Sequence, residues 1–250
     1  MGLKVKTGWV PKRYGEILFP HKSEIVLLRG RGCFHSKCSF CDYYLDKSGD
    51  LKQNFDLNKE VLDNVSGKHL ELEVICSGSF QELDAQTLEY IKQICESKNI
   101  IKLSLECHYK YKNSLSKYKD FFYPTEVNFR IGVESFDVNW RENLMNKNMG
   151  NVDAVEISRY FDYCNLLVGV KSQTKKQIRN DIEIAKANFK RICIGVFESN
   201  GTKVERDEDL VKWFIHEIVP ELRKDSRFQL LIEVSDFPLG DGCMSEVKYE

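Results

Sequence analysis

The sequence predicts an α/β fold, a partial TIM-type barrel of six β/α units with an added C-terminal strand. Seven apolar, strand-like runs recur at fairly even spacing along the 250 residues, with helical patterns between them. Strands that alternate with helices are typical of βαβ units and a parallel sheet. Seven strands are slightly too few for a closed eight-fold barrel. No stretch rich in Gly, Pro or Ser divides the chain, so we expect a single domain.

The strand-like runs place the barrel in the middle of the chain. We expect an N-terminal extension (1–22), a barrel core (23–200) and a closing C-terminal helix and strand (201–250). The expected strands are Ser23–Arg29, Leu70–Cys76, Ile101–Cys107, Val127–Glu134, Tyr163–Val170, Arg191–Phe197 and Phe228–Val234.

Three helices between these runs carry start or stop signals. Asp84 is placed to cap the first helix, and Thr174–Gln177, "TKKQ", has the spacing of a capping box for the second. We expect the third to end at Pro220, because proline lacks the backbone N–H that a helix interior needs. Their apolar faces are Leu88, Ile91 and Cys95; Ile178, Ile182, Ala185 and Phe189; and Val211, Phe214, Ile215 and Ile218.

Composition and charge exclude several classes of protein. The formal net charge of -1 and the pI near 6.5 argue against a main role in binding a phosphate backbone. No run of about 18 apolar residues predicts a membrane span. The first 16 residues have no apolar signal core, and Thr7 lies one position beyond the place that myristoylation at Gly2 requires. We therefore expect a cytoplasmic protein.

Nine cysteines in a cytosolic chain should be mostly reduced thiols. Six of them are scattered, several inside apolar runs, and are expected to pack in the core: Cys76, Cys95, Cys107, Cys164, Cys193 and Cys243. Cys33, Cys38 and Cys41 differ, because they lie close together in the polar segment "GRGCFHSKCSFCDYYLD" directly after the first expected strand. In parallel β/α folds, ligands bind at loops that follow strands in this way.

Two kinds of metal site fit three clustered cysteines. Zinc takes four tetrahedral ligands, and His35 could complete a set with the three thiolates, although it lies awkwardly close to Cys33. A structural zinc site is usually assembled from two separated halves, and no second CxxC pair occurs. A four-iron cluster normally takes four thiolates, so three would leave one iron open to a small molecule. We favour the iron–sulfur cluster and treat a non-catalytic zinc protein as the more distant alternative.

The cysteine segment resembles the cluster loop of the radical S-adenosylmethionine (radical SAM) superfamily, with Phe40 as the aromatic residue before the third cysteine. The resemblance implies that Cys33, Cys38 and Cys41 bind a 4Fe–4S cluster and that SAM chelates the fourth iron. It also implies the partial barrel of that superfamily, a 5′-deoxyadenosyl radical, and a flavodoxin- or ferredoxin-type electron donor. The family's first gap is usually three residues, whereas four separate Cys33 from Cys38 here.

Three later segments resemble SAM-binding motifs of the same superfamily, in the same order along the chain. "CSGSFQ" (Cys76–Gln81) matches the Gly-rich turn, and "FRIGVESFD" (Phe129–Asp137) the fourth-strand motif of the branch with oxygen-independent coproporphyrinogen oxidase. "NLLVGVKSQT" (Asn165–Thr174) matches the fifth-strand segment of that branch. The SAM-binding residues that the resemblance implies are Phe40, Ser77, Gly78, Ser79, Glu134, Ser135, Gly169 and Val170.

Polar residues at other strand ends are candidates for substrate binding. Several acidic groups in one cavity would suit a ligand rich in N–H donors, such as a guanine-like edge or an amine. An aromatic ring in the Tyr43–Tyr44 pair could stack on a flat base. The candidates are Tyr43, Glu106, His108, Lys171, Glu198, Asn200 and Asp236. The sequence assigns no catalytic acid or base.

The substrate could be RNA or a small metabolite. Residues 1–37 carry eight Lys or Arg against two Glu, and residues 108–123 interleave basic and aromatic side chains. Such a surface could bind RNA or dock an acidic electron donor. We favour a metabolite, expect no direct nucleic-acid binding, and keep direct tRNA modification as the alternative. The compact chain and its four-residue gap are similar to the queuine lyases. This resemblance implies C–N bond cleavage in queuine, with release of 7-aminomethyl-7-deazaguanine for queuosine salvage.

Overall fold

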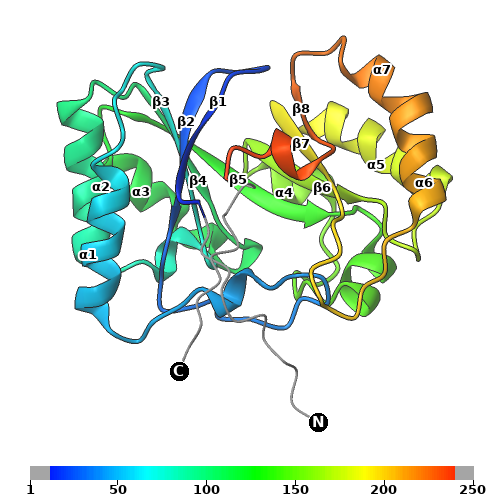
Figure 1. The fold of residues 1–250 in the computed structure, drawn as a ribbon, viewed down its shortest axis with the longest axis horizontal. Coiled ribbons are helices and arrows are strands. Elements are labelled where there is room, and N and C mark those ends of the chain that lie inside the picture. The colour runs from blue at the N-terminus through cyan, green and yellow to red at the C-terminus, as the bar shows by residue number, and fades with distance from the viewer. Residues whose placement is uncertain (1–11, 240–250) are drawn as a thin grey trace.

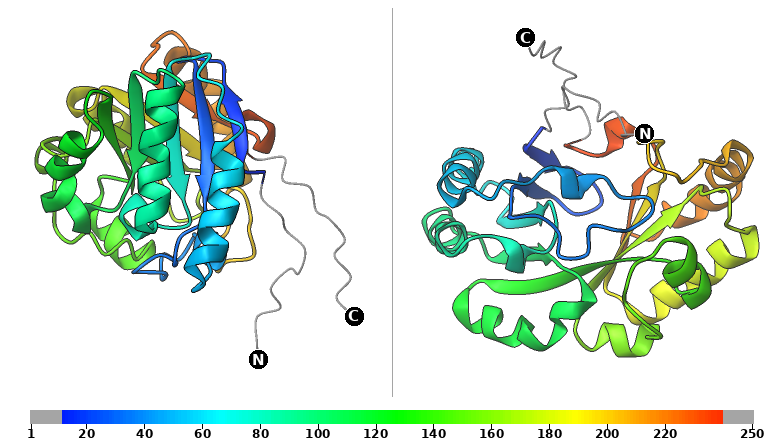
Figure 2. Two further views of the ribbon diagram at one scale, coloured as in Figure 1. Left: turned by 90° about the vertical axis from the view of Figure 1, so that its left-hand side faces the viewer. Right: turned by 90° about the horizontal axis from the view of Figure 1, so that it is seen from below.

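The computed structural model describes residues 12–239 and contains one eight-stranded sheet whose strands follow chain order. β2 to β8 are parallel, and β1 pairs antiparallel with β2 at one edge. The sheet curls into a half-barrel, which confirms the predicted fold class (Figures 1 and 2). The strands are β1 Tyr14–Ile17, β2 Ser23–Leu28, β3 Glu71–Cys76, β4 Lys102–Glu106, β5 Glu126–Glu134, β6 Tyr163–Val168, β7 Arg191–Val196 and β8 Phe228–Leu231.

Helices cover the outer face of the curled sheet, as the right panel of Figure 2 shows. Asp84 caps α2 by accepting from the Thr87 N–H at 2.8 Å, as the sequence predicts. No helix among residues 12–239 combines the length and apolar character needed to cross a bilayer. The helices are α1 Leu51–Leu62, α2 Ala85–Ser97, α3 Leu115–Phe121, α4 Ala154–Ser158, α5 Lys175–Asn188, α6 Glu208–Trp213 and α7 Val219–Leu222.

Two local predictions need correction. The helical path does not end at Pro220, because a π-helical turn at Phe214–Ile218 leads into α7, where proline occupies the first turn. A proline is tolerated there because the first-turn N–H groups have no partner within the helix. Thr174 caps α5 as predicted, accepting from the Gln177 N–H at 3.1 Å. The capping box is not completed, because no bond joins Thr174 N to the side-chain oxygen of Gln177, whose Nε2 donates to Ser135 Oγ at 3.2 Å.

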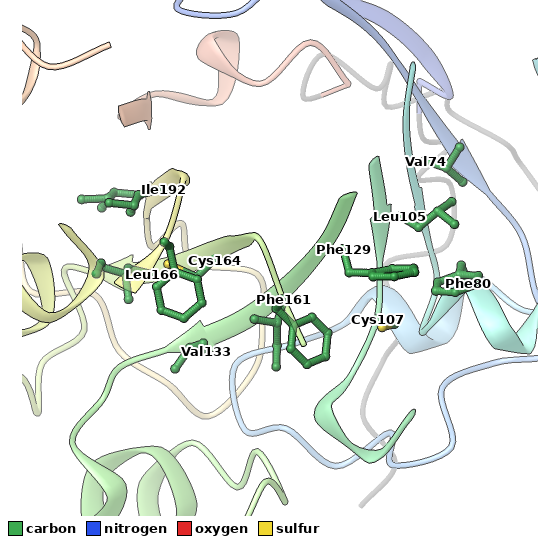
Figure 3. Packing of buried hydrophobic residues seen from close by; sticks show 14 of the residues in the cluster. Val74, Phe80, Leu105, Cys107, Phe129, Val133, Phe161, Cys164, Leu166 and Ile192 are labelled. Carbon is green, nitrogen blue, oxygen red and sulfur yellow. The ribbon is translucent and has the colours of Figure 1, made fainter. Parts of the chain in front are cut away.

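The main hydrophobic core lies between the sheet and its helices. Successive strand residues point to opposite faces, so Val26 and Leu28 of β2 pack in this core. Figure 3 shows Phe80, Phe129 and Phe161 within it. Burying each such side chain contributes about 1.5–3 kcal/mol. Four of the six scattered cysteines pack in this core as expected: Cys76, Cys95, Cys107 and Cys164. Cys193 is also buried, but it lies on the other face of the sheet, against the cavity.

The concave face of the sheet is more polar. On this face Arg130 of β5 pairs with Glu73 at 2.7 Å, and Arg191, at the start of β7, contacts Glu71, at the start of β3. At the β1 edge, Ile25 packs instead against Leu239 in a smaller apolar cluster. The division into a single domain stays a prediction. The predictions for Gly2, Thr7 and Cys243, and the outer parts of segments 1–22 and 201–250, lie outside the described residues.

Candidate active site

A cavity of about 560 Å³ opens where the parallel strands end. Inner-face residues of every strand from β2 to β8 line it, together with the loops that follow β2, β3, β4 and β7. The loop after β2 carries Cys33, Cys38 and Cys41 and is called the cysteine loop below. It crosses the open end of the half-barrel (blue in the right panel of Figure 2). Cavities of this volume are typical of small-molecule sites. This end of the barrel is where the sequence predicts ligand binding.

Cys33, Cys38 and Cys41 all line this cavity, and all three are free, partly buried thiols. Burial raises the pKa of Cys38, and it raises the pKa of Cys41 to about 12. Within residues 12–239, no three His, Cys, Asp or Glu side chains are placed to hold one metal ion. A Cys₃His zinc site needs such convergence, whereas in a 4Fe–4S cluster each thiolate binds its own iron.

The segment that follows the π-helical turn Trp140–Leu144 holds the cysteine loop in place. The Met145 carbonyl accepts from Ser39 N at 3.0 Å, and Asn146 Nδ2 donates to the Lys37 carbonyl at 2.8 Å. His35 Nε2 lies 2.5 Å from the Asn146 carbonyl, so this ring nitrogen is occupied by backbone. The histidine therefore braces the loop and is not needed as a metal ligand.

Gly78 lets the loop after β3 approach the cysteine loop. A Cβ at Gly78 would lie 2.8 Å from Cys33 Cα and within 2.1 Å of Glu82 Oε2, so a larger residue does not fit. Glu82 joins both loops by accepting from Phe34 N and from Ser79 N, each at 2.6 Å. The turn after β3 and the first cysteine are therefore positioned as one unit.

Two predicted serines brace the same turn. Ser77 Oγ accepts from Gly30 N at 3.1 Å, and Ser79 Oγ accepts from His108 N at 3.0 Å. The hydroxyls thus connect the turn to the loops after β2 and β4.

A buried ion pair lies beside the thiols. Lys147 Nζ donates to Glu134 Oε1 at 3.0 Å, and both residues line the cavity. Burial alone would lower the pKa of Lys147, but the Glu134 carboxylate and the neighbouring Cys38 outweigh it and raise that pKa. Glu134 has a φ of 67°, in the left-handed region, just after a register shift in β5. The sequence predicts Glu134 but not Lys147.

Three predicted SAM-binding residues stand behind the cavity wall. Ser135 is buried and donates to Asp181 Oδ2 at 2.6 Å, which anchors the chain after β5 to helix α5. Gly169 has a φ of 93° and packs against Val211, where a Cβ would lie 2.5 Å from Cγ2. Val170 belongs to a small apolar cluster against which Phe40 packs. Phe40 itself lines the cavity.

The predicted substrate residues divide into two groups. Tyr43, Glu106, His108, Glu198 and Asn200 line the cavity. Lys171 is exposed and contacts Glu205, and Asp236 Oδ2 accepts from Ile232 N and Glu233 N in a turn. The structure therefore does not bring Lys171 and Asp236 to the cavity.

Several of the cavity-lining candidates are already engaged by protein groups. The ring of His108 accepts from Lys110 N at 3.1 Å through Nδ1, and its Nε2 lies 2.7 Å from the Lys147 carbonyl. Burial lowers the pKa of His108 to about 4, so the ring is neutral at pH 7. Glu198 contacts Arg206, and Asn200 Nδ2 donates to the Phe40 carbonyl at 2.8 Å.

Several cavity residues are not among the candidates from sequence, including Lys147, Arg130, Asn165, Gly195 and Gln229. The last four lie in the middle of strands, on the inner face. The two-residue period of a strand could have found Arg130, because it shares a face of β5 with Glu134. Lys147 has no such signal, since its segment is an irregular loop in the sequence.

The donors present fit an iron–sulfur cluster with an amino-acid ligand. Three thiols open onto one cavity, and the buried ammonium of Lys147 lies next to two of them, where it can offset negative charge. Gly78 packs closely against Cys33 and has no side chain, so only its backbone faces the cavity beside this cysteine.

Similarity to known proteins agrees with this site. No protein-family model matches the chain. A queuine lyase from Clostridium spiroforme, bound to SAM and queuine, is 40% identical with a TM-score of 0.88, covering 93% of this chain and 100% of that one. SuiB of Streptococcus suis, 14% identical with a TM-score of 0.55, covers 82% of this chain and 48% of its own, and supports the fold alone. An uncharacterized protein of Methanocaldococcus jannaschii is 26% identical over 174 residues, 60% of this chain; the match spans 45% of that relative's length.

The half-barrel, the cysteine loop and the full-length similarity together define the class: the chain belongs to the radical SAM superfamily of enzymes. Within that superfamily it belongs to the queuine lyase family, and it is an enzyme of the lyase type.

Proposed function

We propose that this enzyme uses a 4Fe–4S cluster and SAM to cleave the C–N bond of queuine, releasing 7-aminomethyl-7-deazaguanine for queuosine salvage. The observation that carries the proposal is the 40% identity over the whole of a queuine lyase bound to SAM and queuine. The cavity volume of about 560 Å³ suits a substituted purine-like base next to SAM.

Each part of the proposed site has a task that follows from its surroundings. Cys33, Cys38 and Cys41 would each hold one iron, and the bound cluster with SAM supplies a 5′-deoxyadenosyl radical. Lys147 keeps a positive charge next to these thiolates, and Glu134 holds that ammonium in place. The other proposed SAM contacts are the lining residues Phe40, Ser77, Gly78 and Ser79, while Ser135, Gly169 and Val170 act from behind the wall by fixing its backbone.

Apolar side chains on the remaining wall would keep water away from the reacting atoms. Ile75, Leu167 and Leu231 project from the sheet, and Phe237 joins them from the C-terminal segment. A reactive radical needs such a lining, because water-excluded surroundings limit side reactions. Tyr43, from the cysteine loop, adds an aromatic surface on which a flat base could stack.

Product analysis under anaerobic conditions tests the proposed function. Reconstituted protein with a reductant, SAM and queuine should form 5′-deoxyadenosine and 7-aminomethyl-7-deazaguanine, both measured by mass spectrometry. A Cys33→Ala/Cys38→Ala/Cys41→Ala variant should lose iron, absorption near 400 nm and both products together. Formation of 5′-deoxyadenosine with queuosine-containing tRNA but not with free queuine would replace the proposal by direct tRNA modification.

We also propose a flavodoxin- or ferredoxin-type electron donor and a cytoplasmic location. The eight cysteines among the described residues are all free thiols, which fits a reducing compartment. Beside the first cysteine, Lys110 Nζ lies 4.0 Å from the centre of the Phe34 ring, so a positive charge lies near the cluster loop. An acidic donor would be attracted there. The near-neutral net charge of -1 supports the absence of direct nucleic-acid binding.

A further inference from the structure

Two polar side chains meet on the inner face of the sheet, below the cysteine loop. Glu106 ends β4, Asn165 lies on β6, and Asn165 Nδ2 donates to Glu106 Oε2 at 3.1 Å. Between them runs β5, where Gly132 stands in register with Asn165. Because glycine has no side chain, the inner face stays open at this place and both polar groups line the cavity.

This pair has hydrogen-bonding capacity that the protein does not use. Glu106 Oε1 accepts no hydrogen bond from the described residues, and Asn165 Oδ1 is buried without a donor among them. Arg130, the neighbouring cation, is paired with Glu73 at 2.7 Å. A buried acceptor without a donor, such as Asn165 Oδ1, costs free energy, and Glu106 Oε1 faces the cavity, where a ligand can bring a donor to it.

Two other carboxylates in the cavity, Glu134 and Glu198, are each paired with a cation. Lys147 holds Glu134 at 3.0 Å, and Arg206 holds Glu198. Glu106 is held instead by the neutral amide of Asn165, which fixes its orientation and leaves its second oxygen available to a ligand.

We propose that Glu106, positioned by Asn165, binds the N–H edge of the substrate base and determines which bases the enzyme accepts. The choice of ligand rests on the proposed function. A 2-amino-4-oxopyrimidine ring, as in 7-deazaguanine, presents N1–H and an amino N–H side by side, and a carboxylate accepts two such donors. A base without the 2-amino group presents one donor fewer to this pair.

Binding measurements with two small bases isolate this contact. Calorimetry on the anaerobic, SAM-loaded enzyme compares 7-deazaguanine with 7-deazahypoxanthine, which lacks the 2-amino group. Wild type should bind 7-deazaguanine about tenfold more tightly or better, the value of one good paired contact. Glu106→Gln should remove most of this preference, because the glutamine NH2 group is a donor and cannot accept from the N–H donors of the base. Asn165→Leu, which leaves the carboxylate in place without its donor, should reduce the preference by a smaller factor.

The control is Glu126→Gln, a similar substitution at an exposed position at the other end of β5, and it should keep the wild-type ratio. A wild-type enzyme that binds neither base or does not distinguish them, or a Glu106→Gln variant with the wild-type ratio, overturns the inference. Turnover of queuine is scored separately. If queuine is turned over but Glu106→Gln keeps the wild-type binding ratio, the Glu106 contact is refuted and the proposed reaction stands. If Glu106→Gln removes the preference but wild type forms no product from queuine, the proposed reaction is refuted and the contact stands.

Discussion

Replacing Gly78 by alanine should displace the first cysteine. The new Cβ would lie 2.8 Å from Cys33 Cα and 2.1 Å from Glu82 Oε2, whereas ordinary contact begins at 3.4 Å. The Cys33 backbone must then retreat by about 0.6 Å, and Glu82 must leave its position. Overpacking of this kind costs about 1–3 kcal/mol, and each lost hydrogen bond from Phe34 N or Ser79 N to the carboxylate about 1.5–3 kcal/mol. If one of the two bonds is lost, the free energy of unfolding should fall by about 3 kcal/mol.

For a chain of this size, that loss lowers the melting temperature by about 6–12 °C. Anaerobic calorimetry measures it, and iron and sulfide analysis with absorption near 400 nm measures the cluster, which should be bound incompletely. The matched control is Gly195→Ala, in the same cavity, where the added Cβ meets nothing within 4 Å. That variant should keep wild-type iron content and stability. A Gly78→Ala protein that melts within about 2 °C of wild type with full iron would refute the steric argument.

Three further predictions concern other parts of the site. Burial raises the pKa of Asp181 to about 6, so between about pH 4 and pH 6 the folded protein holds a proton that the unfolded chain has lost. Its contribution to stability is present at low pH and is lost as pH rises through this window, at up to about 1.4 kcal/mol per unit. Denaturant titrations should show that slope flattened in Asp181→Asn, and equal slopes would contradict it. Lys147→Met leaves Glu134 buried without its partner and should lower the free energy of unfolding by about 3 kcal/mol. The double variant Glu134→Gln/Lys147→Met should recover part of this stability, and strict additivity in the double-mutant cycle would argue against coupling. Gly195→Leu fills open cavity space and should raise KM for queuine about tenfold at nearly unchanged melting temperature; an unaltered KM would mean that the substrate lies elsewhere.

The fold is predictable where burial alone forms an element. Strands β2 to β8 appear in the sequence as apolar runs, because a parallel sheet covered by helices buries one continuous face of each strand. β1 escapes prediction since its four residues, "YGEI", are half polar and pair only at an edge. Helix α1 is equally hidden. Its inward residues include Asn58, which accepts from Arg29 N and donates to the Arg29 carbonyl, so an amide replaces the expected apolar stripe.

The site is predictable where spacing along the chain carries the chemistry. Three cysteines in nine residues define a cluster loop from sequence alone, and the structure brings all three to one cavity. The rule that ligands bind at the loops after parallel strands is less precise, because it predicts which loop lies at the site but not the direction of each side chain. It places Glu106 at the cavity, yet Lys171 lies outside, on the surface, and contacts Glu205.

The segment around Lys147 explains why the remainder of the site is hidden. In sequence, "MNKNMG" (Met145–Gly150) has the composition of an ordinary polar loop. In the fold, its backbone carbonyls accept from Ser39 N and lie within hydrogen-bond reach of the His108 ring, and its ammonium holds Glu134. These contacts bridge about 13 to 106 positions along the chain, too far for a local pattern to reveal. One loop thus ties the cysteine loop to the ends of β4 and β5. The position of the three thiols therefore depends on residues that carry no recognisable cluster motif.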